Sequence, residues 1–308
     1  MSKTGKVKIR IKSNWLDYLY ILPAVILVVT FFISSIIYTT YISFFDWNGI
    51  GSKIFVGFQN YISLFKDSNF LISLLNTVIW VAASMVTSLI IPFTLAALIT
   101  RSSGTKLFRS VFYFPATLSG TVGGLIISSL LSTYGLPALL GELTGNTARS
   151  NWLNTPYFNT FLMICAGVWQ GVGLNMLLFI AGIRNMDASP IESAMIDGAK
   201  GLKLYTNVVI PIIKPTILVV MLMTIVNSFK VFDIIWVTTK GGPYRTSETL
   251  AFTMYQESFG HGKYGRGSAV AVVLSLIILV ISYFNIKNFL QRYLRARMIK
   301  TSKKYKRL

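Results

Sequence analysis

Long apolar stretches alternate with short polar and basic segments along the whole chain. An α-helix needs about 20 predominantly apolar residues to cross the hydrocarbon core of a bilayer. The pattern predicts six such transmembrane helices, at approximately residues 18–45, 71–100, 107–132, 158–183, 212–238 and 267–289. The expected fold class is therefore an all-α, polytopic integral membrane protein.

Composition supports a membrane protein rather than a soluble domain. Of the 308 residues, 53% are hydrophobic and only 13% are charged, which is more apolar than a soluble domain of this size. The first apolar run is longer than a signal-peptide core and has no small-residue cleavage site. We therefore expect it to remain as the first transmembrane helix.

The distribution of positive charge predicts the orientation, because cytoplasmic loops of membrane proteins are enriched in Lys and Arg. Most of the 29 Lys and Arg residues fall in the N-terminal tail, the loop around 101–109, the loop between the fourth and fifth apolar stretches, and the C-terminal tail. Both termini and both loops are expected in the cytoplasm. Topology and attraction to anionic membrane lipid account for the net charge of +19. No nucleic-acid partner is expected, because the basic residues do not gather on a soluble domain.

The segment 189–215 lies between the fourth and fifth apolar stretches and carries charges of both signs. Ser189 is placed to cap a helix that begins at the following proline, and Glu192 then falls in the first turn, where the helix dipole favours an anion. A second short helix is predicted over 202–208 and is expected to stop before Pro211. This pattern indicates a helix-turn-helix on the membrane surface, suited to docking a soluble partner.

The same segment resembles the EAA loop of binding-protein-dependent ABC importer permeases. The resemblance is carried by Glu192, Ala194, Asp197, Gly198, Ala199, Tyr205, Val208, Pro211 and Pro215. Ser193 replaces the second alanine of the family pattern. In that family the loop forms a coupling helix that sits in a cleft of the cytoplasmic ATPase subunit. The resemblance implies these residues for coupling to the ATPase: Glu192, Ala194, Asp197, Gly198, Ala199 and Gly201.

Polar side chains interrupt the fourth and fifth apolar stretches. Unpaired amides would be costly in hydrocarbon, so these residues are expected to face either a wet cavity or a neighbouring helix. Hydrogen bonding between helices and lining of a solute cavity both remain open from the residues alone. The stretch 169–176 (WQGVGLNM) resembles the family segment that lines the translocation cavity. The cavity candidates are Trp169, Gln170, Asn175, Thr224, Asn227 and Ser228.

Lys230 and Asp233 are three residues apart at the end of the fifth stretch. Mutual pairing is one interpretation, because ionisable groups near a membrane are usually paired, and a role in gating or substrate contact is the other. The segment 232–243 (FDIIWVTTKGGP) that follows resembles the FDxIxxxTxGGP motif of carbohydrate permeases. Earlier in the chain, 55–61 (FVGFQNY) resembles the FVGLxNY segment of sugar permeases. Both favour the carbohydrate branch of the family.

Catalytic and metal-binding signatures are absent from the sequence. There is no GxxxxGK[ST] phosphate loop, HExxH or GxSxG pattern. The single histidine, His261, and the single cysteine, Cys165, have no sequence partners for a metal site or a disulfide. We therefore expect no enzymatic activity, no cofactor and no metal, with ATP hydrolysis on separate subunits.

Together these features predict a permease subunit in the cell membrane that imports a sugar or oligosaccharide. The resemblance implies a second homologous permease, two ATP-binding cassette subunits and an extracellular solute-binding protein as partners. The expected organisation has three parts. Residues 1–69 form a cytoplasmic basic tail, the first transmembrane helix and an outer loop. Residues 70–290 form the core transmembrane domain, with the coupling loop at 189–215, and 291–308 form a basic cytoplasmic tail. A stand-alone secondary transporter or channel is the main alternative, and a membrane assembly factor is another. The sequence does not identify the sugar.

Overall fold

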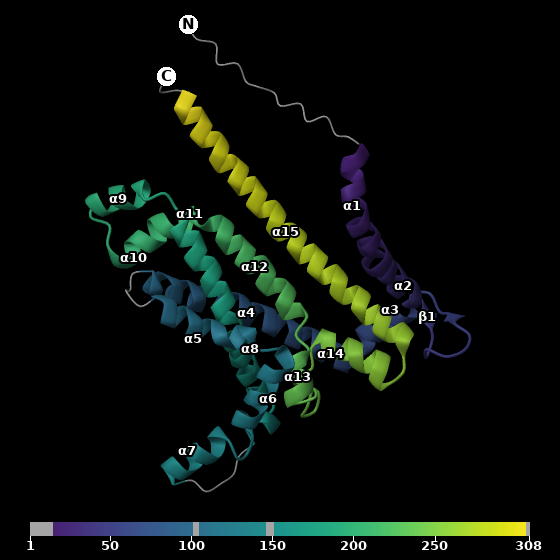
Figure 1. Ribbon diagram of the computed structural model, residues 1–308. Helices are drawn as coiled ribbons and strands as arrows, with labels where there is room; N and C mark the ends of the chain where they lie inside the picture. Colours follow the sequence, from purple (N-terminus) through teal and green to yellow (C-terminus); the bar gives the residue numbers. More distant parts are fainter. Residues whose placement is uncertain (1–14, 101–104, 146–150, 306–308) are drawn as a thin grey trace.

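The structure is a computed structural model that describes residues 15–100, 105–145 and 151–305. Helices make up almost all of this part of the chain (Figure 1). The strands are β1 (Phe45–Asp46) and β2 (Ile54–Phe55), which pair antiparallel in the loop after the first membrane helix. The predicted all-α class is confirmed. The predicted basic tail over 1–13, together with Arg101, lies outside the described residues.

Six segments among the described residues are long and apolar enough to cross a membrane, as predicted. They are Tyr18–Ile42, Ser68–Ile99, Gly120–Thr144, Phe158–Arg184, Lys214–Thr238 and Tyr264–Lys287. The helices before residue 150 are α1 (Trp15–Leu27), a π-helical turn (Val28–Ile33), α2 (Ser34–Ile42), α3 (Gln59–Lys66), α4 (Ser68–Ile99), α5 (Thr105–Thr117), α6 (Gly120–Leu131) and α7 (Leu136–Thr144). After it come a 3-10 turn (Trp152–Asn154), α8 (Phe158–Arg184), α12 (Lys214–Phe229), α13 (Asp233–Thr238), α14 (Leu250–Tyr255), a π-helical turn (Gln256–Gly260) and α15 (Tyr264–Tyr305).

The third predicted span is not one continuous helix, and this expectation was wrong. Between α5 and α6 the chain breaks at Leu118 and Ser119. The Ser119 side chain accepts a hydrogen bond from the Val122 amide and so caps α6. Pro115, near the end of α5, supplies no amide hydrogen to the helix. The apolar stretch therefore continues through α6 into α7, up to Thr144, instead of ending near residue 132.

The fifth predicted span is also divided, into α12 and α13. The Lys230 amide bonds the Asn227 carbonyl, which closes α12 with a tight turn, and α13 then begins at Asp233. The freed carbonyl of Val231 accepts a hydrogen bond from the Thr249 hydroxyl at 2.9 Å. Broken helices are tolerated inside a membrane protein where other groups satisfy the backbone in this way.

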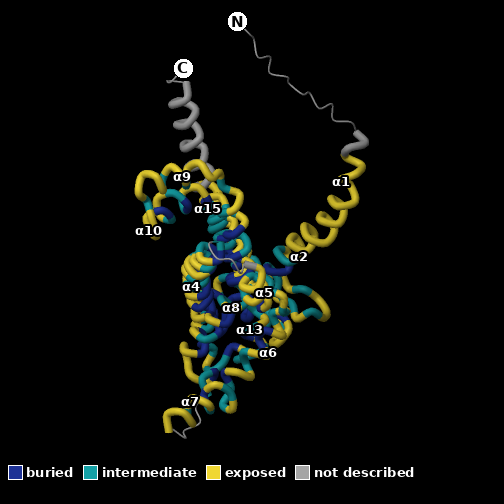
Figure 2. The backbone as a smooth tube through the Cα atoms, turned by 60° about the vertical axis from the view of Figure 1, so that its left-hand side comes forward, coloured by how far each residue is buried: buried dark blue, intermediate teal, exposed yellow. Residues whose placement is uncertain are grey.

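The core of the bundle is built on α4. This helix packs against α8 and α12, while α5 packs along α8 and α13 lies on α6. In Figure 2 the buried residues gather around α8 and α13, whereas residues 18–27 of α1 are exposed and the helix diverges from the bundle. At the other end of the chain, α15 is 42 residues long, roughly 60 Å, and continues without a break across residue 290.

The loop between α13 and α14 is held by side chains from two other helices. The Asn76 amide of α4 donates hydrogen bonds to the carbonyl oxygens of Thr246, at 2.9 Å, and Glu248, at 3.0 Å. From α8, the Asn159 amide donates to the Gly242 carbonyl at 2.8 Å. Because these donors are buried, the loop has a defined position relative to the bundle.

Segment 189–215 forms two helical parts, as predicted, but with different ends. α9 spans Ser189–Ile196, and Ser189 is its first residue, so its side chain does not cap the helix. The second part consists of α10 (Gly201–Leu204), a π-helical turn (Tyr205–Val209) and α11 (Ile210–Ile212). Pro211 lies inside this last helix and does not stop it. A proline early in a short helix removes a bond that the first turn lacks anyway.

Candidate functional site

A cavity of about 440 Å³ lies where α4, α8 and α12 meet the two helix breaks. Five of the six predicted cavity residues line it: Gln170, Asn175, Thr224, Asn227 and Ser228. The first two come from α8 and the other three from α12. The polar faces of two helices that are distant in the sequence therefore meet around one space.

Trp169, the sixth predicted residue, is not among the cavity-lining residues. Its side chain is 37% exposed on the surface of α8. Neighbouring residues on a helix are turned by about 100° from each other, so Trp169 and Gln170 need not share a face. The cavity is instead bordered by two other aromatic residues, Trp80 and Phe232.

Both helix breaks border this cavity. Gly120 contributes from the start of α6, and Val231, Phe232 and Asp233 contribute from the break between α12 and α13. Gln170, which also lines the cavity, donates from Nε2 to the Leu118 carbonyl at 3.1 Å. The amide thus satisfies a backbone oxygen that the broken helix leaves free.

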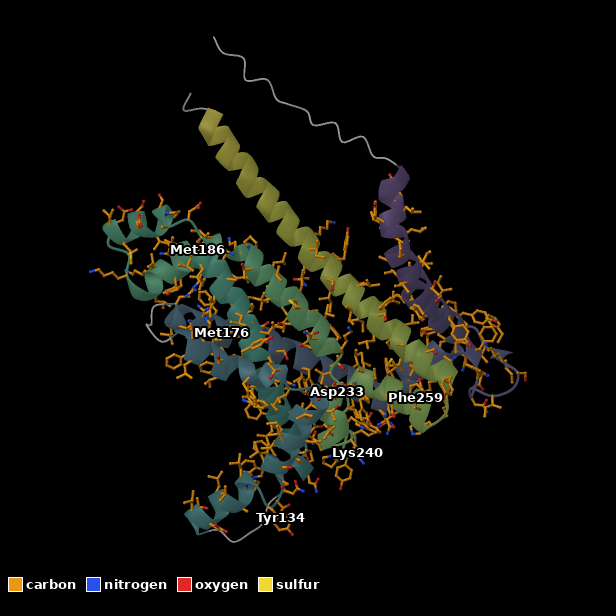
Figure 3. The ribbon with its side chains drawn as sticks, in the orientation of Figure 1. Tyr134, Met176, Met186, Asp233, Lys240 and Phe259 are labelled. Carbon is orange, nitrogen blue, oxygen red and sulfur yellow. The ribbon has the colours of Figure 1, made fainter. Side chains whose placement is uncertain are left out.

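Lys230 and Asp233 both line the cavity but form no ion pair with each other in the described part of the chain. The expected pairing is therefore not found. The Asp233 carboxylate instead packs against Gly120, where an added Cβ would collide with Oδ2. This is the N-terminus of α6, where the helix dipole favours an anion. Figure 3 shows Asp233 in the middle of the bundle, between the end that carries Met186 and the end that carries Tyr134 and Lys240.

One wall of the cavity was missed by the sequence analysis. Trp80, Ser84 and Ser88 on α4 all line it. Their spacing of four residues is the available signal, because it places polar groups on one face of an otherwise apolar helix. Two polar atoms of cavity-lining residues, Trp80 Nε1 and Thr224 Oγ1, are buried and have no hydrogen-bond partner among the residues that the structure describes.

The predicted coupling residues lie together on the α9–α10 unit, at one end of the bundle (Figure 1). Glu192, Asp197, Gly198 and Gly201 are exposed, and Ala194 and Ala199 are half-buried. Gly198 and Gly201 have φ angles of +84° and +53°, which glycine adopts far more readily than other residues.

Tyr205, in the π-helical turn after α10, links this unit to the membrane helices. Its hydroxyl donates to the Ala97 carbonyl of α4 at 3.2 Å, and its ring meets Phe93 edge to face. These two contacts connect the α9–α10 unit to α4, the helix on which the bundle is built.

Comparison with known protein families identifies the chain. Residues 88–300 match the family described as the binding-protein-dependent transport system inner membrane component. The chain belongs to this family. It is a multi-pass permease of the cell membrane and the transmembrane part of an ABC importer.

Relatives similar over most of their length support the assignment. A probable ABC transporter permease of Pyrococcus horikoshii is 35% identical over 271 residues, covering 85% of this chain and 91% of that protein. The permease protein MsmF of a multiple sugar-binding transport system in Streptococcus mutans is 30% identical over 280 residues, covering 90% and 96%. AmyD of Thermoanaerobacterium thermosulfurigenes, a probable permease for starch degradation products, is 31% identical over 274 residues, covering 87% and 92%.

The fold is also that of a solved transporter. A chain of a bacterial ABC transporter involved in the import of the acidic polysaccharide alginate superimposes with a TM-score of 0.79. The match covers 91% of this permease and 96% of that chain at 22% sequence identity. At this identity the likeness concerns the fold alone.

Proposed function

We propose that this permease carries a saccharide through the cavity between α4, α8 and α12. The observation that carries the proposal is the meeting of five polar side chains from α8 and α12 around one space of about 440 Å³. Small-molecule sites in proteins typically measure roughly 300–1,000 Å³. Sugar hydroxyl groups need donors and acceptors, which amide and hydroxyl side chains supply, while aromatic rings suit their C–H faces.

The names of the relatives support a saccharide as the solute. They refer to multiple sugars, starch degradation products, arabinooligosaccharides and alpha-glucosides. The cavity residues proposed to contact the solute are Gln170, Asn175, Thr224, Asn227 and Ser228. Trp169 lies outside the cavity, on the surface of α8, and is not proposed to contact the solute.

The proposed assembly is the one that the resemblance to importer permeases implies, and the family description itself refers to a binding protein. One such permease pairs with a second homologous permease above two ATP-binding subunits, and an extracellular solute-binding protein delivers the sugar. A related solved transporter is in complex with a periplasmic protein that holds an alginate pentasaccharide. The basic ends of the chain favour a cytoplasmic position for both termini and for the α9–α10 unit. The core domain of this arrangement is proposed over 70–290.

In this proposal the permease itself is not catalytic. ATP hydrolysis on the partner subunits moves the α9–α10 unit, through contacts at Glu192, Ala194, Asp197, Gly198, Ala199 and Gly201. The Tyr205–Ala97 hydrogen bond passes the motion to α4, and the cavity opens to each side of the membrane in turn.

Uptake in cells of the source organism tests the proposal. The chromosomal gene is deleted and restored on a plasmid, and uptake of radiolabelled maltotriose, arabinotriose and sucrose is measured. We expect the wild-type chain to restore uptake of at least one of them, and Asn227→Ala and Ser228→Ala to reduce it several-fold. The exposed loop variant Asn154→Ala is the matched control and is expected to transport normally.

Two results contradict the proposal. If cells with the restored wild-type chain take up none of the three saccharides, a saccharide is not the transported solute. Uptake that continues after the cells are depleted of ATP, with an ion gradient still imposed, would favour the stand-alone secondary transporter instead.

A further inference from the structure

Trp80, Ser84 and Ser88 form a face of α4 that borders the cavity and is not explained by any motif. Trp80 and Ser84 precede residue 88, where the match to the family begins. Between 80 and 88 the helix carries no charged residue, so this wall of the cavity is neutral.

We propose that this α4 face binds the solute directly. Trp80 Nε1 and the hydroxyl groups of Ser84 and Ser88 hydrogen-bond the hydroxyl groups of an uncharged saccharide as it passes through the cavity. The inference rests on the proposed function and adds a third contacting helix to α8 and α12.

Trp80 has a donor that no group in the described part of the chain uses. The residue is 2% exposed, and Nε1 has no hydrogen-bond partner there. An indole N–H can only donate, and leaving it unpaired within a membrane is unfavourable. The six-membered ring of the indole packs closely against Gly167 of α8, where an added Cβ would lie 3.2 Å from Cζ3. A ligand acceptor in the cavity would complete the missing bond.

A second unused polar atom lies on the neighbouring helix. Within the described ranges, Thr224 Oγ1 of α12 is buried and has no hydrogen-bond partner, and Thr224 lines the same cavity as Trp80. Because α4 and α12 pack against each other, the two groups bound one solute space. An uncharged sugar hydroxyl can accept from the indole and either donate to or accept from the threonine.

The serine hydroxyls of this face also differ from the four other hydroxyls in the interior of α4. Ser73, Thr77, Thr87 and Thr94 each donate to a carbonyl three or four residues earlier, the usual arrangement in membrane helices. Among the described residues, no such bond is made by the hydroxyl of Ser84 or Ser88. The two hydroxyls at the cavity are therefore free to bind a solute.

Uptake kinetics of conservative variants test whether this face of α4 binds the solute. Trp80→Phe keeps a ring against Gly167 but removes the N–H, and Ser84→Ala and Ser88→Ala remove only the hydroxyls. The matched control is Thr87→Ala, which removes a neighbouring hydroxyl that bonds its own helix and does not line the cavity. In the restored cells, the concentration for half-maximal uptake of the transported saccharide is expected to rise roughly 3- to 10-fold for Trp80→Phe and less for each serine, with no change for Thr87→Ala.

Cysteine labelling gives a second measurement that does not depend on transport rate. Cys165 is the only cysteine, so Cys165→Ser provides a cysteine-free background. Ser84→Cys and Ser88→Cys are expected to react with a methanethiosulfonate reagent in membranes, and the transported saccharide is expected to slow the reaction. Ser73→Cys, at a site that is 0% exposed, is the unreactive control.

The outcomes separate this inference from the proposed function. Wild-type uptake with unchanged half-saturation in Trp80→Phe, Ser84→Ala and Ser88→Ala would overturn the α4 wall alone. So would a lack of labelling at positions 84 and 88, or labelling that the saccharide does not slow. Absence of saccharide uptake by the wild-type chain would overturn the proposed function and, with it, this inference.

Discussion

The Gln170 amide of α8 donates a hydrogen bond to the Leu118 carbonyl oxygen at 3.1 Å, across 52 positions of the sequence. Leu118 lies at the break between α5 and α6, and Gln170 lines the cavity. One side chain therefore holds the break and faces the solute space. A solute that competes for this amide would loosen the connection between α8 and the start of α6.

Replacing Gln170 with methionine is expected to weaken the bundle. The change keeps the side-chain length but leaves the Leu118 carbonyl without its donor, at a cost of about 1–3 kcal/mol. The melting temperature of the detergent-solubilised permease should fall. Cys165→Ala, at an exposed position on the same helix, is the control and should melt like the wild type. An unchanged melting temperature in Gln170→Met would show that the bond does not hold the break.

Alanine substitutions at two glycines of α8 should have different effects on the stability of the protein. A Cβ at Gly173 would collide with backbone atoms of Phe112 and Tyr113 on α5, which cannot move as a flexible side chain would. A Cβ at Gly171 would meet nothing within 4 Å. We expect Gly173→Ala to separate α5 from α8 and destabilise the protein by about 1–3 kcal/mol.

The measurement is the amount of folded permease in membranes and its melting temperature. Gly171→Ala is the matched control, and it should remain close to the wild type in both. Equal behaviour of the two variants would contradict the close α5–α8 approach at Gly173.

Asn76→Asp is expected to release the loop between α13 and α14. The substitution is nearly isosteric but replaces an amide donor with acceptor oxygens that face the carbonyls of Thr246 and Glu248. Leaving buried groups unsatisfied costs about 1–3 kcal/mol each, and more when one is charged. Limited trypsin digestion should then cut faster after Lys240 and Arg245. The rate should not change in Asn154→Asp, which alters an exposed asparagine; if the two variants are cut alike, the clamp is not what protects the loop.

Gly198 allows a test that separates backbone conformation from close approach of a partner. At φ +84°, alanine is strained by about 1–2 kcal/mol, whereas asparagine tolerates this region better. In membranes containing the assembled transporter, Gly198→Ala is expected to reduce solute-stimulated ATP hydrolysis. Gly198→Asn should retain more of it if conformation is the requirement. A greater loss in Gly198→Asn would show that lack of a side chain matters instead, and normal stimulation in both variants would remove Gly198 from the proposed coupling contact.

The hydrophobic pattern was enough to predict the all-α class and the six apolar segments, because a helix that crosses a membrane must bury a long run of apolar residues. It also predicted which polar residues are unusual. Gln170, Asn175, Thr224, Asn227 and Ser228 stand out in apolar helices, and they do meet around a cavity. The spacing of the residues from Glu192 to Pro215 was enough for the family resemblance, because that segment is local in sequence.

Only the tertiary structure decided where the membrane segments break and which residues complete the cavity. The free carbonyls at the breaks are satisfied by Gln170 and Thr249, which lie 52 and 18 positions from the oxygens that they bond. A local pattern cannot show such partners, so both segments read as continuous helices. Trp80 is also recognisable only in the fold. Many positions of an apolar helix can hold a tryptophan. Only the fold shows that this one packs against Gly167, lines the cavity and has an indole N–H with no hydrogen-bond partner in the described part of the chain.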